Sequence, residues 1–245
     1  MNPTTLNLLA VSVFAFTMLS LVGPLFNISP SAVAIAIAAI TGIFAADRFI
    51  AKGTGGNILI DLVSRQSSDY RQRILHHEAG HFLIAHLLEI PVQSYTLSAW
   101  EAAKAGLPGM GGVVLDTSAV ESELETGTLS AQQMNRYCIL WMAGIAAETQ
   151  VYGNAAGGDD DLMKLRLLWQ QTQRTAAAAD TQIRWALLQA QTLLEKQKAA
   201  YTALVEAMST RASVEECLQA IEANKTEPKE AEANKADTPI PEALL

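Results

Sequence analysis

The 245-residue sequence contains few cysteines and few charged residues. Its two cysteines, Cys138 and Cys217, cannot form a disulfide framework, so a reducing compartment fits better than a secreted one. Charged residues make up only 17% of the chain, whereas half of the residues are hydrophobic. An average soluble domain is about 25% charged. This imbalance predicts a membrane segment attached to one well-packed domain.

Basic residues are in the minority. Seventeen Lys and Arg stand against 25 Asp and Glu, which gives a formal charge of −8. The sequence therefore has no basic stripe that could neutralise phosphates, and it excludes nucleic acid as a partner. The glycine-rich stretch at 53–57 lacks the spacing and the Lys-Ser/Thr pair of a phosphate-binding loop. It predicts a flexible linker over residues 53–66.

Two apolar runs occupy the N-terminal region. Leu6–Phe26 contains no charged residue, and as a helix it would span about 32 Å, the thickness of a bilayer's hydrocarbon core. Residues 27–31 predict a turn, and a shorter, alanine-rich run follows at Ala32–Ala46. We predict a transmembrane helical hairpin over residues 1–52, which makes membrane lipid a partner.

A cleaved signal peptide is the competing interpretation, because Ala34-Ile35-Ala36 offers small residues for cleavage. Against it, the N-terminal tail has no Lys or Arg, and a second apolar run follows at once. Basic residues gather after the second run, whereas the tail and the turn are uncharged. The positive-inside rule therefore predicts an integral membrane protein whose C-terminal domain lies on the cytoplasmic or stromal side.

A mainly helical domain with a small β-sheet is predicted over residues 67–223. Ser68 or Asp69 can cap a helix that runs to about Glu89, where Pro91 prevents its continuation. Two β-like segments follow at Val92–Leu97 and Gly112–Leu115, and a glycine-rich loop is expected between them.

Capping signals divide the rest of the domain. Ser130 with Gln133 predicts a helix that ends at Gly153, and Ser213 with Glu216 predicts another helix start. From residue 161 to about 222 the chain has no Pro or Gly and shows helical apolar spacing, so at least two helices are expected. The last residues, 224–245, are rich in Glu, Lys, Ala and Pro and predict a disordered tail.

The most specific motif is His77-Glu78-Ala79-Gly80-His81. Histidines four apart on a helix lie on adjacent turns of one face, so both imidazoles can bind one metal ion. Glu78 is rotated by about 100° from His77, close enough to reach a water on that ion without binding the ion itself. Zinc lowers the pKa of such a water, and a carboxylate can then take its proton. The motif predicts a Zn²⁺ site with Glu78 as the general base.

Two observations support a metal at this helix. Gly80 costs ~1 kcal/mol relative to Ala inside a helix, so a close approach is expected there. Polar residues interrupt an otherwise apolar helix, and a metal would give them partners. A hydrogen-bonded His-Glu-His cluster without an ion is the alternative. His76 and His86 point away from His77 by about 100° and 180°, and we expect them to be surface or packing residues.

A catalytic zinc needs a third protein ligand and an open position for water. Spacing leaves four candidates: Glu148, Asp159, Asp160 and Asp161. Acidic residues at a helix start often only complement the helix dipole.

A series of sequence elements resembles the peptidase domain of FtsH-type membrane metalloproteases. The resemblance covers about residues 69 to 210, and two preceding membrane spans fit it as well. The elements occur in the expected order: Leu75–His81, Pro91-Val92, Gly111-Gly112-Val113, Ala143–Glu148 with Tyr152-Gly153, and Gly157–Leu162.

The resemblance implies that Asp161, four residues after Gly157, is the third zinc ligand beside His77 and His81. It also implies peptide hydrolysis with Glu78 activating water. The other acidic candidates then have lesser roles: Glu148 is structural or supports a ligand, and Asp159 and Asp160 are helix caps.

Protein or peptide substrates are implied to pair in extended form with an edge strand near Gly111–Leu115. FtsH-type proteins carry an ATPase module between membrane and peptidase domain, and here only the linker occupies that place. We therefore expect hydrolysis of flexible or unfolded segments, including those of membrane proteins. An ATPase partner in trans and a homo-oligomeric ring are both compatible with the resemblance.

Two other functions compete with this interpretation. An intramembrane site-2-type metalloprotease also uses His, His and Asp, but its metal helix should span the membrane, and here Arg71 and Arg73 directly precede the motif. The second is a membrane adaptor whose zinc site is structural or vestigial. Retention of Glu78 between intact ligands argues against an adaptor.

Overall fold

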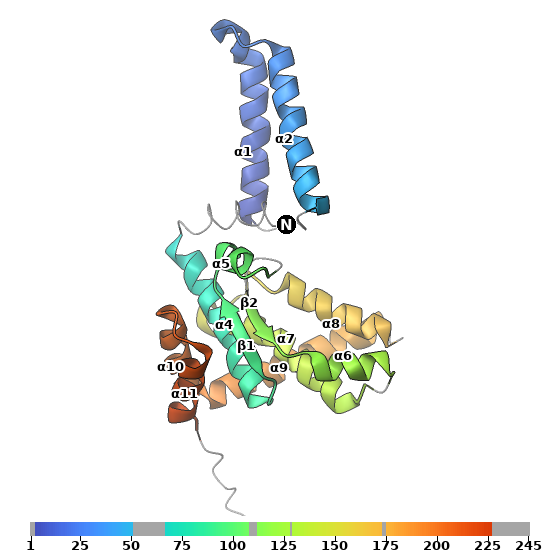
Figure 1. The fold of residues 1–245 in the computed structure, drawn as a ribbon, viewed down its shortest axis with the longest axis vertical. Coiled ribbons are helices and arrows are strands. Elements are labelled where there is room, and N and C mark those ends of the chain that lie inside the picture. The colour runs from blue at the N-terminus through green and yellow to red at the C-terminus, as the bar shows by residue number, and fades with distance from the viewer. Residues whose placement is uncertain (1–2, 51–66, 108–111, 128, 173–174, 227–245) are drawn as a thin grey trace, which may run out of the picture.

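The structure is a computed structural model that describes residues 3–50, 67–107, 112–127, 129–172 and 175–226. The predicted linker at 53–66 and most of the predicted tail, 227–245, lie outside the described residues. The described residues are mainly helical and include one two-stranded sheet (Figure 1). The predicted fold class is confirmed at this level.

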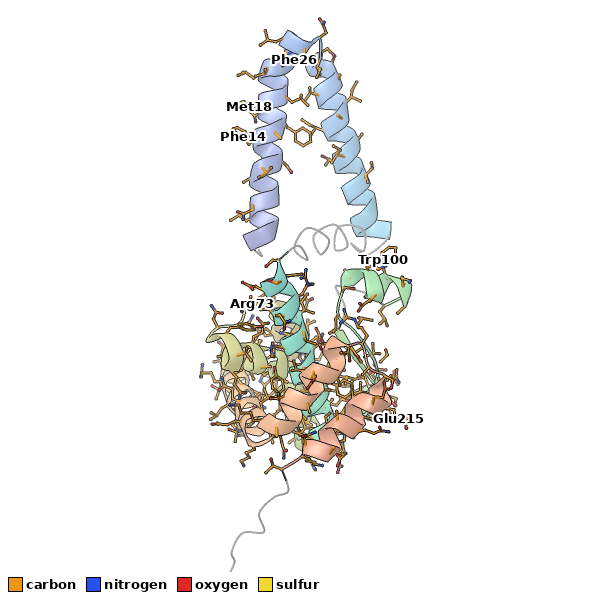
Figure 2. All side chains as sticks on the ribbon, turned by 90° about the vertical axis from the view of Figure 1, so that its left-hand side faces the viewer. Phe14, Met18, Phe26, Arg73, Trp100 and Glu215 are labelled. Carbon is orange, nitrogen blue, oxygen red and sulfur yellow. The ribbon has the colours of Figure 1, made fainter. Side chains whose placement is uncertain are left out.

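The N-terminal region forms a helical hairpin. Helix α1 (Pro3–Val22) continues into a short 3-10 helix, η1 (Gly23–Phe26), and α2 (Pro30–Ile50) runs back beside α1 (Figure 1). Asn27 adopts the left-handed conformation at φ 57°, and the N–H of Ile28 donates to the carbonyl of Gly23 at 2.9 Å. Apolar side chains such as Phe14 and Phe26 project outwards, as expected of a surface that faces lipid (Figure 2).

The apolar run at the N-terminus is confirmed as a helix that could cross a membrane. Leu9–Phe26 is long and apolar enough by length and composition, a criterion that a signal sequence would also meet. The apolar part of α2 is shorter, Ser31–Ile43. A second span and the orientation of the hairpin therefore remain predictions.

Helix α4 (Ser68–Leu87) carries the histidine motif. Its cap is Ser67, one residue before the predicted start, and the Ser67 side chain accepts from the N–H of Tyr70. Adjacent Ser and Asp residues are all competent caps, so the sequence could not choose the position. The helix ends before Glu89, which takes the left-handed conformation at φ 55°.

Strands β1 (Val92–Thr96) and β2 (Gly112–Leu115) pair antiparallel, with Tyr95 opposite Val113. The expectation of only a loop between them was wrong, because residues 99–104 form helix α5 (Ala99–Lys104). Ser98 caps α5 by accepting from the N–H of Glu101 at 3.1 Å. An unpredicted helix, α6 (Ser118–Glu125), follows β2.

The core forms where α4 packs along α7 (Ala131–Tyr152). A Cβ on Gly80 would lie 2.6 Å from the carbonyl oxygen of Ala143 and 2.7 Å from the Cβ of Ala147. The expected close approach at Gly80 is therefore confirmed. Helix α7 ends at Gly153, as predicted, in the left-handed conformation.

The predicted capping boxes differ in outcome. Ser130 caps α7, but its own N–H donates to Glu123 rather than to Gln133, so only half of that box forms. The box of Ser213 and Glu216 is complete. The predicted multiplicity of helices after residue 161 is also confirmed, by α8 (Asp159–Gln171), α9 (Ala176–Lys196), α10 (Lys198–Ser209) and α11 (Val214–Asn224).

Candidate metal centre

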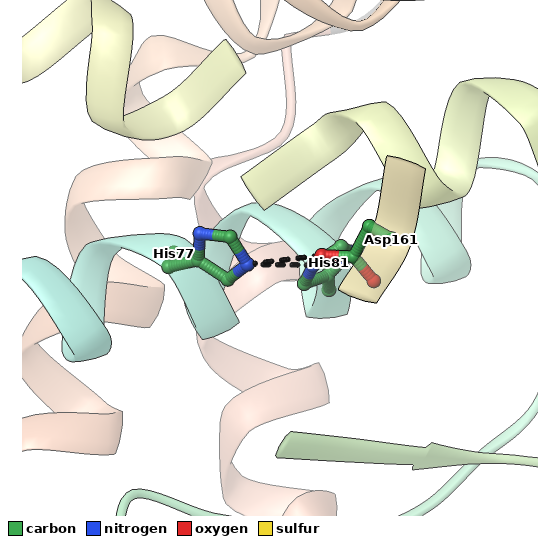
Figure 3. A group of neighbouring side chains, drawn as sticks. All are labelled: His77, His81 and Asp161. Atoms are coloured by element: carbon green, nitrogen blue, oxygen red, sulfur yellow. Dashed lines mark hydrogen bonds and ion pairs between the residues drawn. The ribbon is translucent and has the colours of Figure 1, made fainter. Parts of the chain in front are cut away.

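Helices α4 and α8 bring three metal-binding side chains together. His77 and His81 lie on one face of α4, and Asp161 lies in the first turn of α8 (Figure 3). Gly158 caps α8 at φ 101°, and a Cβ there would lie 2.3 Å from the Cγ1 of Ile145. A side chain at that position would be both strained and blocked, so glycine lets α8 begin close to α7, which itself packs along α4.

The donor atoms form a nearly equilateral triangle. His77 Nε2 lies 3.1 Å from His81 Nε2, and Asp161 Oδ2 lies 3.2 Å from each of the two nitrogens. A tetrahedral ion with bonds of about 2.0–2.1 Å would place its ligand atoms about 3.3 Å apart. The three side chains are 12%, 9% and 9% exposed. The group could therefore hold a metal ion in a nearly buried site.

Hydrogen bonds outside the triangle determine how the two rings are protonated. His81 Nδ1 lies 2.9 Å from the carbonyl oxygen of Leu140, which can only accept, so this nitrogen donates. His77 Nδ1 lies 2.8 Å from the Glu148 carboxylate and donates in the same way. In neutral rings both Nε2 lone pairs then point at the Asp161 carboxylate. Three acceptors converge on one point, which requires a cation between them.

The electrostatics of the site lead to the same requirement. Burial lowers the pKa of His77, but hydrogen bonds to Asp161 and Glu148 outweigh burial and raise that pKa to about 10. Burial raises the pKa of Asp161, but the charge of His81 and its hydrogen bonds to both rings hold that pKa well below its usual range. The site therefore stabilises a positive charge, whether a proton or a metal ion carries it.

Glu148 lies behind His77 rather than in the triangle. Its carboxylate is 2% exposed and accepts from His77 Nδ1, from Arg73 Nη1 at 3.2 Å, and from the N–H groups of Ala156 at 2.8 Å and Gly157 at 3.2 Å. With both oxygens occupied, Glu148 orients the His77 ring. Carboxylates in this position commonly fix the tautomer of a metal-binding histidine.

The other acidic candidates lie outside the triangle. Asp159 and Asp160 are exposed in the first turn of α8, where they complement the helix dipole. Neither is the cap, since Gly158 holds that position.

Glu78 contacts the sheet. Its Oε2 accepts from the backbone N–H of Val113 in β2 at 3.0 Å. The N–H of Val113 therefore points away from β1, and that edge of β2 faces the catalytic candidate on α4. The structure thus places Glu78 next to the strand for which a substrate-binding role was expected.

His76 and His86 stay outside the centre, as expected. His76 Nδ1 lies 2.9 Å from the hydroxyl of Tyr201, and His86 Nε2 lies 2.6 Å from the carboxylate of Glu222 near the surface.

Several supporting residues were not predicted. Arg73 donates to Glu148 and stacks over the ring of Tyr152 at 4.3 Å, and Lys164 donates to the outer oxygen of Asp161 at 3.0 Å. Gly144 faces the His77 ring so closely that a Cβ would lie 2.3 Å from Nε2. A close approach at Gly144 was nevertheless implied by the resemblance, because the small residues of the Ala143–Glu148 element permit close helix packing; its contact with the His77 ring was not. Arg73 and Lys164 gave no signal in the sequence.

No protein-family model matches this chain, and no curated protein matches its sequence. The resemblance to FtsH-type peptidases therefore depends on the quoted motifs and on the site described above.

Proposed function

We propose that the protein is a membrane-anchored zinc metalloendopeptidase that hydrolyses flexible or unfolded segments of proteins, without an ATPase module of its own. The observation that carries this proposal is the triangle of His77, His81 and Asp161, with Glu78 beside it on α4. Two imidazoles and one carboxylate form a donor set typical of catalytic zinc sites, in which a water takes the fourth position. The resemblance to FtsH-type peptidases supports the same reaction.

The chain's own residues supply positioning and proton transfer. Zinc held by the three ligands would act as a Lewis acid and provide a nucleophile from water near neutral pH. Leu140 and Glu148 fix the rings of His81 and His77 by accepting from their Nδ1 atoms. The Glu78 carboxylate takes the proton of the attacking water and delivers it to the leaving amine.

The edge of β2 is suited to binding an extended peptide. In an antiparallel ladder successive residues alternate between the two edges, and Val113 turns its N–H away from β1 towards Glu78. A substrate strand that adds to this edge would pass directly beside the Glu78 carboxylate. We propose this edge as the substrate-binding strand.

A Glu78→Gln variant tests the proposal sharply. Gln keeps an amide oxygen that can accept from the N–H of Val113, so the strand contact survives while the base is lost. We expect the wild type to cleave casein without ATP and the variant to be slower by at least about 100-fold, with its zinc retained. A Glu222→Gln variant, which changes only the surface pairs with His86 and Lys225, serves as the control. Equal cleavage by Glu78→Gln and wild type would refute a catalytic role for Glu78.

A membrane adaptor with a structural zinc site is the second candidate. It is favoured by the bond between Glu78 and Val113, which gives Glu78 a structural role without catalysis. Zinc in both proteins with no cleavage by either would support the adaptor, or a peptidase that needs an ATPase partner in trans.

The site-2-type alternative requires the metal helix to span the membrane. Among the described residues, only α1 with η1 is long and apolar enough to do so. Helix α4 instead packs against α7 within the helical domain.

A further inference from the structure

Helix α5 has one buried face and one face exposed to solvent. Its buried side consists of Ala99 and Ala102, which are 1% and 0% exposed. On the outside, Trp100 is 56% exposed, the most exposed of the four tryptophans. Lys104, four residues later, is also exposed and lies on the same side of the helix. An exposed tryptophan next to a lysine is typical of residues at a membrane–water interface.

The position of α5 in the domain supports a membrane as its partner. Both views show α5 at the same end of the helical domain as the first turn of α4, and Figure 2 labels Trp100 at that end (Figures 1 and 2). Ser67, the cap of α4, is the first described residue after the hairpin helix α2, which ends at Ile50. The chain therefore enters the domain at this end, after seventeen residue steps from α2 that span at most about 60 Å.

We propose that α5 docks on the lipid bilayer that holds the hairpin, with Trp100 in the interfacial region and Lys104 near the headgroup phosphates. The inference rests on the proposed membrane anchoring. The indole ring has an apolar body and one polar N–H, so it gains most at the headgroup boundary. Lysine can extend its apolar stem along the ring while its ammonium group stays in the hydrated layer.

This docking would define the class of substrate. Leu107, the last described residue after α5, precedes Gly112 of β2 by five residues, a reach of at most about 18 Å. The edge strand beside Glu78 is therefore held near the bilayer surface. The segments it would bind are extended stretches of membrane proteins that emerge from the same bilayer, close to a transmembrane helix.

Site-directed spin labelling tests the docking. Cys138 and Cys217 are both 0% exposed, so a nitroxide reagent will modify a new surface cysteine selectively. The full chain with Ala103→Cys, which keeps Trp100 and Lys104, is placed in lipid nanodiscs, and collisions of the label with oxygen and with a water-soluble nickel chelate are compared. We expect the label at position 103 to favour oxygen. A matched label at Leu188→Cys in α9, which is 58% exposed, should favour the nickel chelate.

Each other outcome overturns the inference in a distinct way. Equal nickel accessibility at positions 103 and 188 places α5 in water, and shielding of position 103 from both reagents places it against another protein, such as a second copy. A label at Leu21→Cys in α1 reports on the anchor: if it also favours nickel, membrane anchoring fails and the docking fails with it. Ala105→Cys, at the exposed end of α5, replaces Ala103→Cys if the latter does not fold. Casein cleavage is measured separately, so loss of docking and loss of the proposed activity are distinguishable.

Discussion

A single added methyl group should disable the metal centre. Gly144 lies inside α7 with its Cα facing the His77 ring, and a Cβ there would lie 2.3 Å from Nε2 and 2.4 Å from Cε1. Ordinary contact begins at 3.4 Å, so in Gly144→Ala the ring must move by about 1.1 Å. Metal–ligand distances tolerate only about 0.2 Å. His77 would therefore cease to be a ligand.

Gly144→Ala should weaken zinc binding more than the loss of a residue that only supports a ligand. Loss of an outer-shell contact commonly costs 10–100-fold in metal affinity, so we expect Gly144→Ala to weaken zinc binding by more than about 100-fold, or about 2.7 kcal/mol. The helix itself should tolerate alanine, which it ordinarily prefers to glycine by roughly 0.5–1 kcal/mol.

Competition with a chromophoric chelator measures the affinity, and circular dichroism checks that the variant is folded. Gly42→Ala in α2 is the control, since no atom lies within 4 Å of its added Cβ. A folded Gly144→Ala protein whose zinc affinity stays within about threefold of wild type would refute the assignment of His77.

Three further predictions concern the same centre. Glu148→Gln should lower zinc affinity by about 10–100-fold, because the amide holds His77 less well than the carboxylate does, whereas Glu222→Gln should leave it unchanged. Zinc affinity should rise by about tenfold per pH unit around neutrality: the zinc-free protein holds a proton on His77, whose pKa is about 10, and that proton must leave when zinc binds. A flat profile from pH 6 to 8 would contradict this. Gly80→Ala should destabilise the protein by about 1–3 kcal/mol and so lower its thermal unfolding midpoint, because the added Cβ meets the backbone of α7; a higher midpoint, as in an ordinary helix, would show that the helices can separate.

The histidine pair could be predicted from the sequence because a helix's own geometry fixes the relation of His77 to His81. The third ligand could not be chosen by spacing, since Asp161 lies 80 residues further along the chain. Its position depends on how α8 packs against α7, which in turn depends on the left-handed turn at Gly158. The resemblance selected Asp161, and the structure places it next to both rings.

The choice between Glu148 and Asp161 depends on tertiary structure. Both are buried acids near His77, but α7 presents Glu148 to Nδ1, whereas α8 presents Asp161 to Nε2. No local pattern distinguishes the two nitrogens of one ring. The hydrogen bond from Val113 to Glu78 could not be predicted from the sequence either, because it joins a helix to a strand 35 residues away.

Some features that were not predicted did have a local signal in the sequence. Ser98 with Glu101 marks the start of α5, but the glycines that follow favoured a loop. A run of Ala, Trp, Glu and Lys has adequate helix propensity, and its cap is formed by the side chain of Ser98. A capping box also depends on which acceptors lie nearby. The N–H of Ser130 donates to Glu123 of α6, so it does not donate to the side chain of Gln133.

Zinc K-edge absorption of the purified protein is the most direct test of the proposed zinc site. We predict one zinc per chain, with two imidazole nitrogens and at least one carboxylate oxygen at about 2.0–2.1 Å. Asp161→Asn should weaken or abolish this signal. Absence of zinc would contradict the account, and so would sulfur scattering at about 2.3 Å, because it would move the metal from His77, His81 and Asp161 to the cysteines.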